Sequence, residues 1–253
     1  MSSEIMNEFN KNNIDDYLKE LAKAYRKAVG KNMPAELILI GGASVLINYG
    51  FRNMTTDIDA IITAASGMKD AINIVRYKYN LPVGWLNEDF QKTASYTPKL
   101  SQHSVYYRTY SNVLTIRTIT AEYLIAMKLK SGRPYKNDLS DIVGILYEQE
   151  RSGHPLSLAS IERAVIDLYD TWDNIPELSR SFIEDISKNN DLKSIYSKVC
   201  LDEKETRKDL ITFEKKYPKA LSTDNANDIA ASLSAKRDKD SIIAKLNEMK
   251  ADQ

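Results

Sequence analysis

The spacing of hydrophobic and polar residues predicts an alternation of helices and short strands over the first half of the chain. Apolar residues between Ile14 and Tyr25 recur at helical spacing, and the pattern stops near Gly30. A compact aliphatic run then ends abruptly at Gly41-Gly42, as expected for a short buried strand that leads into a turn. The elements expected before residue 120 are helices over 14–30, 43–49 and 68–79 and strands over 36–40, 55–63, 105–107 and 113–116, with the turn of the last pair at 110–112.

From Thr120 onward the helical pattern dominates. A break at residues 132–134 separates the first two of these helices, and Gly153-His154-Pro155 forms the clearest boundary in the chain. We expect an α+β fold in which a small mixed sheet flanked by helices, over residues 1–150, precedes a helical region over 151–253. The expected helices are 121–130, one that begins near Asn137 or Asp138, 161–169, 178–186, 192–199 and a charged helix over 230–249.

Composition restricts the class of protein without identifying it. With 253 residues, 43% of them hydrophobic and 28% charged, the chain can bury a core, unlike a disordered protein. Its 35 basic and 35 acidic residues cancel, so no overall positive field indicates nucleic-acid binding. A single cysteine and two histidines exclude an intramolecular disulfide and Cys- or His-rich metal sites. The first residues lack the apolar segment of a secretory signal and no apolar run approaches a membrane span, so we expect a cytoplasmic protein that does not bind membranes.

The junction at Gly41-Gly42 is the first candidate for chemistry. A strand that runs through glycines into a helix gathers unpaired backbone N–H groups at the positive end of the helix dipole, which favours a phosphate. Glycine permits close approach of such a ligand because it has no side chain. The alternative interpretation is an ordinary tight turn between a strand and a helix.

The second candidate is Asp57-Ile58-Asp59. Alternate residues of a strand share a face, so both carboxylates would point the same way with Cα atoms roughly 6.5 Å apart. Two adjacent carboxylates repel each other unless a cation lies between them, and a hard divalent cation prefers oxygen ligands. The alternative is a solvated strand end with two ordinary aspartates. A phosphate-binding turn followed by a carboxylate pair provides the parts needed for metal-dependent nucleotidyl transfer.

These two motifs resemble the DNA polymerase β-like nucleotidyltransferase superfamily, in which a Gly-Gly or Gly-Ser turn binds triphosphate and a following Asp-x-Asp binds Mg²⁺. More narrowly, the chain is similar to AbiEii-type bacterial nucleotidyltransferases, some of them toxin-like. The narrower resemblance rests on a second block over residues 121–142, and the whole resemblance covers roughly residues 36–146. It implies transfer of a nucleoside monophosphate from a nucleoside triphosphate to an acceptor. The implied site is Asp57 and Asp59 for Mg²⁺ or Mn²⁺, Gly41, Gly42, Ser44 and Arg133 for the nucleotide, Lys128 to neutralise the triphosphate, and Asp138 and Asp141 in support.

The residues of this second block can also be interpreted from their positions in the predicted helices, without the resemblance. Lys128 lies on or beside the apolar stripe of its helix, so it either needs a buried anion or extends past the core edge into water. Arg133 follows a helix-ending glycine and could clamp a phosphate or lie on the surface. Asp138 and Asp141 fall in a first helical turn, where the dipole alone favours carboxylates, and they could also hold Lys128 or Arg133 through ion pairs.

The sequence departs from the superfamily pattern in two places. Ala43 follows the glycine pair, so a hydroxyl contact to phosphate would have to come from Ser44 or from elsewhere. Many superfamily members use a third carboxylate on a later strand, but residues 113–118 contain no acid. The third acid would then come from the helix with Asp138 and Asp141, or from a residue outside both motifs, or two carboxylates suffice, or activity is lost. The other acids considered are Glu88, Asp89 and Glu122.

Several hypotheses for the partner therefore stay open. The acceptor could be an RNA end, a protein side chain or a small molecule. The alternative function is a catalytically inactive nucleotide-binding or protein-interaction module on the same fold. Other residues have a structural interpretation as well as a functional one. Four aromatic side chains could stack on a base or lie in the core or at its rim. Arg52 is a loop arginine that could touch phosphate, and Cys200 is expected in the core. The aromatic residues are Trp85, Tyr106, Tyr107 and Tyr110.

Overall fold

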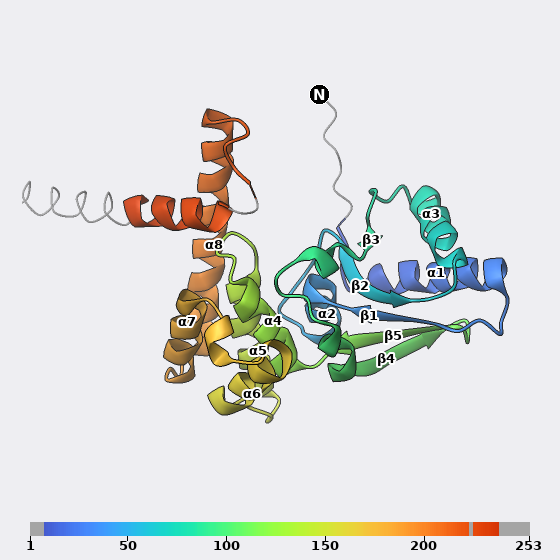
Figure 1. The fold of residues 1–253 in the computed structure, drawn as a ribbon, viewed down its shortest axis with the longest axis horizontal. Coiled ribbons are helices and arrows are strands. Elements are labelled where there is room, and N and C mark those ends of the chain that lie inside the picture. Colours follow the sequence, from blue (N-terminus) through green and yellow to red (C-terminus); the bar gives the residue numbers. More distant parts are fainter. Residues whose placement is uncertain (1–7, 223–224, 238–253) are drawn as a thin grey trace, which may run out of the picture.

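A computed structural model describes residues 8–222 and 225–237 of the chain. The expected α+β fold is confirmed: a five-stranded mixed sheet is flanked by helices and followed by a helical region (Figure 1). The strand order is β3-β2-β1-β5-β4, and β1 is parallel to β5 but antiparallel to β2. The strands are β1 (Ala35–Leu39), β2 (Ile58–Thr63), β3 (Leu86–Asn87), β4 (Ser104–Tyr110) and β5 (Leu114–Ile119).

One face of the sheet is covered by two helices, α1 (Ile14–Val29) and α3 (Gly67–Tyr79), which pack on each other (Figure 1). The strands supply alternate residues to this core, among them Leu37, Ile58 and Ala60. Because side chains of a strand alternate between faces, Asp59 must point to the opposite face, where Ile61 and Ile38 lie. Because Ile58 and Ala60, on either side of Asp59, are buried in the core under α1 and α3, the side chain of Asp59 lies on the other face of the sheet.

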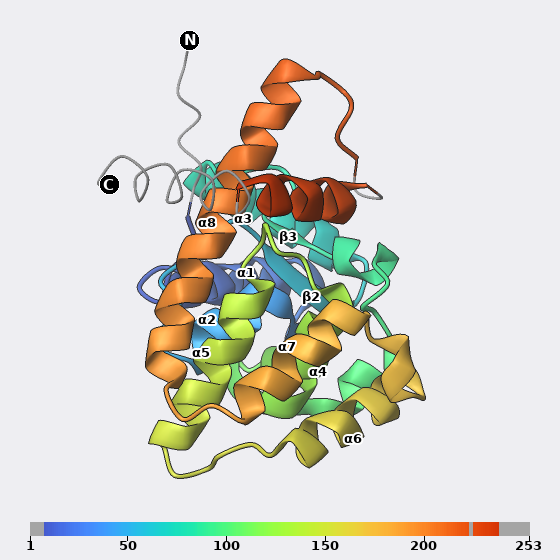
Figure 2. The same ribbon diagram turned by 90° about the vertical axis from the view of Figure 1, so that its left-hand side faces the viewer.

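The helical region lies at the end of the sheet where β1 and β5 finish (Figure 1), and Figure 2 views it from that side. A second core joins the sheet residues Ile38 and Ile40 to the helices α4 and α5 and continues into α6 and α7. The helices of this part are α2 (Gly41–Asn48), α4 (Ala121–Ser131), α5 (Asp138–Arg151), α6 (Leu158–Tyr169), α7 (Glu177–Ser187) and α8 (Leu192–Lys216), and three short 3₁₀ turns are η1 (Asp89–Lys92), η2 (Pro98–His103) and η3 (Trp172–Asn174). A further helix includes residues 226–237.

Several expected elements differ from the structure: the strand expected over 105–107 spans Ser104–Tyr110, the helix expected over 161–169 begins at Leu158, and β3 was not expected. The strand expected from residue 55 begins at Ile58, because Thr55 instead forms an isolated antiparallel bridge with Phe9. The helix expected from residue 43 begins at Gly41. The helix expected over 192–199 continues to Lys216, and the buried residues of its second half include Glu203 and Thr206, a partly polar stripe that hydrophobic periodicity does not reveal. Of the helix expected over 230–249, residues 238–249 lie outside the described part of the chain.

The second core crosses residue 150, since side chains from α4 and α5 pack in it with side chains from α6 and α7. The division into a domain over 1–150 and a domain over 151–253 stays a prediction. No helix within residues 8–222 and 225–237 is both long enough and apolar enough to span a membrane.

Candidate functional site

The end of β1 brings the start of α2 against Asp59 of β2. The N–H of Ile40 donates to the carbonyl oxygen of Asp59 at 2.9 Å, which fixes the two segments side by side. Gly41 has φ +52°, a left-handed conformation that a side chain strains. A Cβ added to Gly41 would lie 3.8 Å from Oδ2 of Asp59. The carboxylate of Asp59 therefore lies beside the first residue of the helix.

A side chain at Gly42 would collide with two neighbouring side chains. A Cβ at this position would lie 2.6 Å from Oγ1 of Thr55 and 2.8 Å from Nη2 of Arg52. The missing side chain thus lets the guanidinium of Arg52 reach the start of α2. The first N–H groups of any α-helix have no partner within the helix, and Ser44 is the first residue here whose N–H bonds back, to Ile40. A cation and the positive end of a helix consequently face the same place.

The two aspartates of the Asp-x-Asp motif have different environments. Asp57 is exposed in a bend before β2, so it is not the strand residue that the sequence pattern predicts, whereas Asp59 is partly buried in the strand itself. Burial, and then the charge of Asp57, raise the pKa of Asp59 to about 6, and Arg133 and Lys128 counter only part of this effect. The pair is therefore a site where additional positive charge would be stabilising.

Lys128 of α4 points inward, as expected if it needs a buried anion, and does not extend into water. Its side chain is 9% exposed, and its Nζ lies 2.8 Å from Oδ1 of Asp138 and 2.9 Å from Oδ2 of Asp141. Burial opposes the charged form of Lys128, but the two carboxylates outweigh burial and raise its pKa. Burial likewise opposes ionisation of Asp138, but Lys128 and Arg133 hold the pKa of that carboxyl well below its usual range. The ion pairs considered from the sequence are thus present.

Two arginines complete the network. Nε of Arg133 lies 2.8 Å from Asp138, and Nη1 of Arg52 forms an ion pair with Asp141. Three cations therefore meet two anions, Asp138 and Asp141, so that the network carries one net positive charge. It reaches the start of α2 through Arg52 and acts on Asp59 through Lys128 and Arg133.

The hydroxyl of Ser44 lies elsewhere. Ser44 is fully buried, and its Oγ accepts a hydrogen bond from the N–H of Ile119 at 3.1 Å. This bond ties α2 to the end of β5, which leads into α4. The hydroxyl faces the core between these elements, so we do not include Ser44 in the nucleotide contacts proposed below.

Among the acids considered as a third carboxylate, Asp89 is the one whose charge acts on Asp59, raising its pKa. Asp89 is exposed at the start of η1 and pairs with Lys92 at 2.6 Å. Glu88 accepts the N–H of Ile62 at 3.2 Å, and Glu122 accepts the hydroxyl of Thr120. Asp138 and Asp141 are held by the cations described above. Within residues 8–222 and 225–237, no group of three or more His, Cys, Asp and Glu side chains is arranged to hold a metal ion.

The aromatic residues mostly have structural environments. Trp85 is buried and its indole N–H donates to the carbonyl of Ile72. Tyr107 donates to Asp15, and Tyr110 is 8% exposed. Tyr106 is 61% exposed on β4.

A cavity of about 340 Å³ lies beside the charge network, between the loop that follows α2 and the helices α5 and α8. Arg52 and Asp141 line it from one side, and Glu203, Lys204 and Arg207 line it from α8. Sequence reasoning missed Glu203, because its contacts with α5 join residues more than 60 positions apart in the chain.

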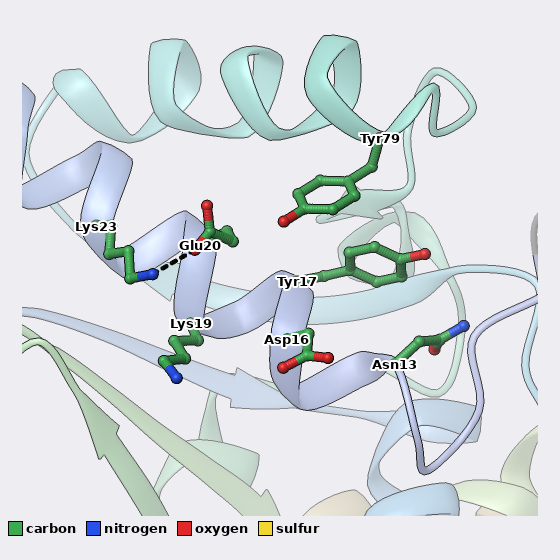
Figure 3. A pocket seen from close by; sticks show the side chains of 7 residues that line it. All are labelled: Asn13, Asp16, Tyr17, Lys19, Glu20, Lys23 and Tyr79. Carbon is green, nitrogen blue, oxygen red and sulfur yellow. Dashed lines mark hydrogen bonds and ion pairs between the residues drawn. The ribbon is translucent and has the colours of Figure 1, made fainter.

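Another pocket, of about 260 Å³, lies on α1 beside the end of α3 (Figure 3). There Glu20 pairs with Lys23 and Lys78, and the rings of Tyr17 and Tyr79 pack edge to face. Both helices cover the sheet face opposite to Asp59. Because its charged side chains pair with each other away from the aspartates, this pocket is not part of the candidate site.

Comparison with known proteins places this geometry in context. A family model described as "Nucleotidyltransferase of unknown function (DUF6036)" matches residues 12–150, more than half of the chain. The match includes Gly41-Gly42, Asp57, Asp59 and the whole charge network. No curated protein and no solved structure matches the chain significantly.

Proposed function

We propose that this chain, which belongs to the nucleotidyltransferase family of unknown function named above, transfers a nucleoside monophosphate from a nucleoside triphosphate to an acceptor and releases pyrophosphate. The observation that carries the proposal is the position of Asp59 beside Gly41. The start of α2 favours an anion, yet a carboxylate of raised pKa lies next to it. A triphosphate together with a divalent cation satisfies both groups at once.

The residues fit Mg²⁺ or Mn²⁺. Asp57 and Asp59 offer oxygen ligands, and Mg²⁺ in phosphate-transfer sites commonly uses one or two protein carboxylates together with substrate phosphates. We assign the metal to these two aspartates, with Asp89 as the candidate for a further carboxylate. When bound, the cation would neutralise charge on the phosphates and help to align them.

The remaining roles follow from charge and position. The N–H groups at Gly41 and Gly42 would hold the β- and γ-phosphates, and Arg52 would add positive charge at the same end of α2. Lys128 and Arg133 would stabilise the negative charge that develops as the bond between the α-phosphorus and its bridging oxygen breaks. The acceptor oxygen forms the new bond to that phosphorus and, where it is a hydroxyl, gives up its proton to water, and the electron pair of the broken bond leaves with pyrophosphate.

At a finer level we propose an AbiEii-type enzyme, because Lys128, Arg133, Asp138 and Asp141 all match the second motif of that type and form one network. The acceptor is an RNA end, a protein side chain or a small molecule, and a toxin-like role is part of this proposal. The absence of an acid on β5 instead favours a nucleotide-binding module without catalysis, which is the second candidate function.

The test is transfer of label from each of the four α-³²P-labelled nucleoside triphosphates, with Mg²⁺ or Mn²⁺, to total RNA, to protein and to the chain itself. We expect metal-dependent transfer from one nucleotide. Asp57→Asn and Asp59→Asn should abolish transfer, whereas the matched control Asp202→Asn, an exposed aspartate in the middle of α8, should keep it. Binding of nucleotide without transfer to any acceptor would favour the inactive module, and full activity of both site variants would refute the metal assignment.

A further inference from the structure

Glu203 of α8 closes the start of α5. Its Oε1 accepts the N–H of Leu139 at 3.0 Å and the N–H of Ser140 at 3.1 Å. The N-cap residue of α5, Asn137, makes no capping bond with its side chain. Glu203 therefore supplies from another helix the cap that α5 lacks locally, and it does so while only 3% exposed.

The turn that Glu203 caps carries both anions of the charge network. Asp138 immediately precedes Leu139, and Asp141 immediately follows Ser140. These two carboxylates hold Lys128, Arg133 and Arg52. A displacement of the first turn of α5 would therefore move all three cations relative to Asp59 and the start of α2.

We infer that Glu203 is a positioning residue for the proposed nucleotide site, through which α8 sets the place of the cations Lys128, Arg133 and Arg52. The inference rests on the proposed function, since it concerns the residues assigned to the triphosphate. It adds a residue outside the matched 12–150 segment to the working site. The helical region then takes part in nucleotide binding without touching the nucleotide.

The surroundings of Glu203 make this device sensitive to pH. Burial raises the pKa of Glu203 to about 7; the N–H and hydroxyl of Ser140 oppose the rise, and the charge of Asp141 adds to it. The other charged or titratable groups at this place are Tyr196, Cys200, Lys204 and Arg207 of α8 and Arg52 of the loop after α2, all of which line the same cavity of about 340 Å³.

An ionised carboxylate accepts hydrogen bonds more strongly than a neutral one. The two hydrogen bonds to α5 should therefore be stronger above the pKa of Glu203 than below it, whereas the cost of burying the charge lowers the stability of the fold as pH rises from about 4.5 to about 7. Glu203→Gln keeps a carbonyl acceptor of the same reach but stays neutral at every pH. Glu203→Leu removes the acceptor and leaves the part-buried N–H of Leu139 and the buried N–H of Ser140 without it.

The experiment is titration calorimetry of the full chain with ATP, GTP, CTP and UTP in the presence of Mg²⁺, at pH 6 and pH 8. It compares the wild type with Glu203→Gln, Glu203→Leu and the control Glu205→Gln, a neighbour on α8 that pairs only with Arg237 in the described structure. Thermal melting of each variant at both pH values establishes that the protein is folded at the temperature of titration.

We expect the wild type and Glu203→Gln to bind the preferred nucleotide equally at pH 6. At pH 8 the wild type should bind the nucleotide up to about three times more tightly than Glu203→Gln does, in line with the greater strength of hydrogen bonds to charged groups. Glu203→Leu should bind about tenfold more weakly, the size of effect seen when a group that orients ligands is removed. Glu205→Gln should follow the wild type at both pH values.

A purely structural Glu203 would change melting temperature but not the difference in affinity between pH 6 and pH 8. The inference is overturned if Glu203→Gln matches the wild type at pH 8, or if folded Glu203→Leu binds nucleotide as tightly as the wild type. In both cases the proposed function stands, because the wild type still binds. If the wild type binds no nucleotide at either pH, the proposed function and this inference fail together.

Discussion

The ammonium group of Lys128 lies 2.9 Å from a carboxylate oxygen of Asp141, in a position where little solvent reaches either side chain. The same carboxylate also pairs with Arg52, whose guanidinium reaches Gly42 at the start of α2. One buried anion thus connects a lysine of α4 to the turn between β1 and α2. This connection makes the candidate site a single electrostatic unit, although its parts lie up to 100 residues apart in the sequence.

Replacing Lys128 should lower the free energy of unfolding. Lys128→Met keeps much of the volume but leaves Asp138 and Asp141 with fewer cations in a buried place. We expect a loss of about 3 kcal/mol in the free energy of unfolding, measured with urea at pH 7, since removing one partner from a buried ion pair is strongly destabilising. Lys69→Met, at an exposed position on α3, should change stability by less than about 0.5 kcal/mol. Equal effects of the two substitutions would contradict the buried network.

Asp59 should destabilise the protein in the absence of ligands at neutral pH. Its pKa rises from the usual 3.8 to about 6 in the folded state, so the folded protein binds this proton more tightly than the unfolded chain does. Stability therefore falls as pH rises from about 4 to about 6, and the loss is fully present above that range. Asp59→Asn removes this loss. Because one pKa unit corresponds to about 1.4 kcal/mol and the group is partly exposed, we expect a gain of about 1–2 kcal/mol at pH 8.

The measurement is urea unfolding of the metal-free wild type and Asp59→Asn at pH 4 and pH 8. The two proteins should have similar stability at pH 4, where the wild-type carboxyl is largely protonated. Asp202→Asn, at an exposed position on α8, should show no comparable gain. A variant that is less stable than the wild type at pH 8 would mean that Asp59 is a structural residue, contrary to our assignment.

Adding a methyl group at Gly42 tests whether Arg52 and the start of α2 belong to the nucleotide site. In Gly42→Ala the new methyl group would overlap Oγ1 of Thr55 and Nη2 of Arg52. We expect Arg52 to be displaced, with a loss of about 1–3 kcal/mol in stability and a marked loss of triphosphate affinity. Gly153→Ala provides the comparison, because it adds a methyl group where nothing lies within 4 Å, at a position with φ +81°. It should cost stability of about 1 kcal/mol and leave nucleotide affinity unchanged. Unchanged affinity in folded Gly42→Ala would remove Arg52 and the α2 turn from the site.

Local patterns predicted most of the fold. The aliphatic run before Gly41, the turn at Ser111-Asn112 and the helix break near Gly132 are all signals carried by a few adjacent residues, and the structure confirms each of them. Residues 203–219 were expected to be a solvated helix face, and the burial of Glu203 and Thr206 in α8 was missed because both residue types are usually found at the surface. The start of β2 was misplaced because Thr55 pairs with Phe9, a contact between distant segments.

The candidate site was predictable only in part, for the same physical reason. Motifs predicted Gly41-Gly42, Asp57, Asp59 and Lys128 as candidates, and hydrophobic periodicity correctly indicated that Lys128 faces inward as one alternative. The partners that matter to these residues come from distant segments. No local signal distinguishes Arg52 from a surface arginine or Glu203 from a solvated glutamate, since their environments arise only when α5 and α8 pack together. Ser44 illustrates the reverse case, in which a plausible phosphate contact is used to join α2 to β5.

The most direct test of the central claim is titration calorimetry of the wild type and Asp57→Asn with ATP, GTP, CTP and UTP, with and without Mg²⁺. Asp57 is exposed, so its replacement should leave the fold unchanged. We predict that the wild type binds one nucleotide in a Mg²⁺-dependent manner and that Asp57→Asn loses this dependence. If the wild type binds no nucleotide under any condition, or if both proteins bind it alike with Mg²⁺, the assignment of Asp57 and Asp59 to a metal–triphosphate site is contradicted.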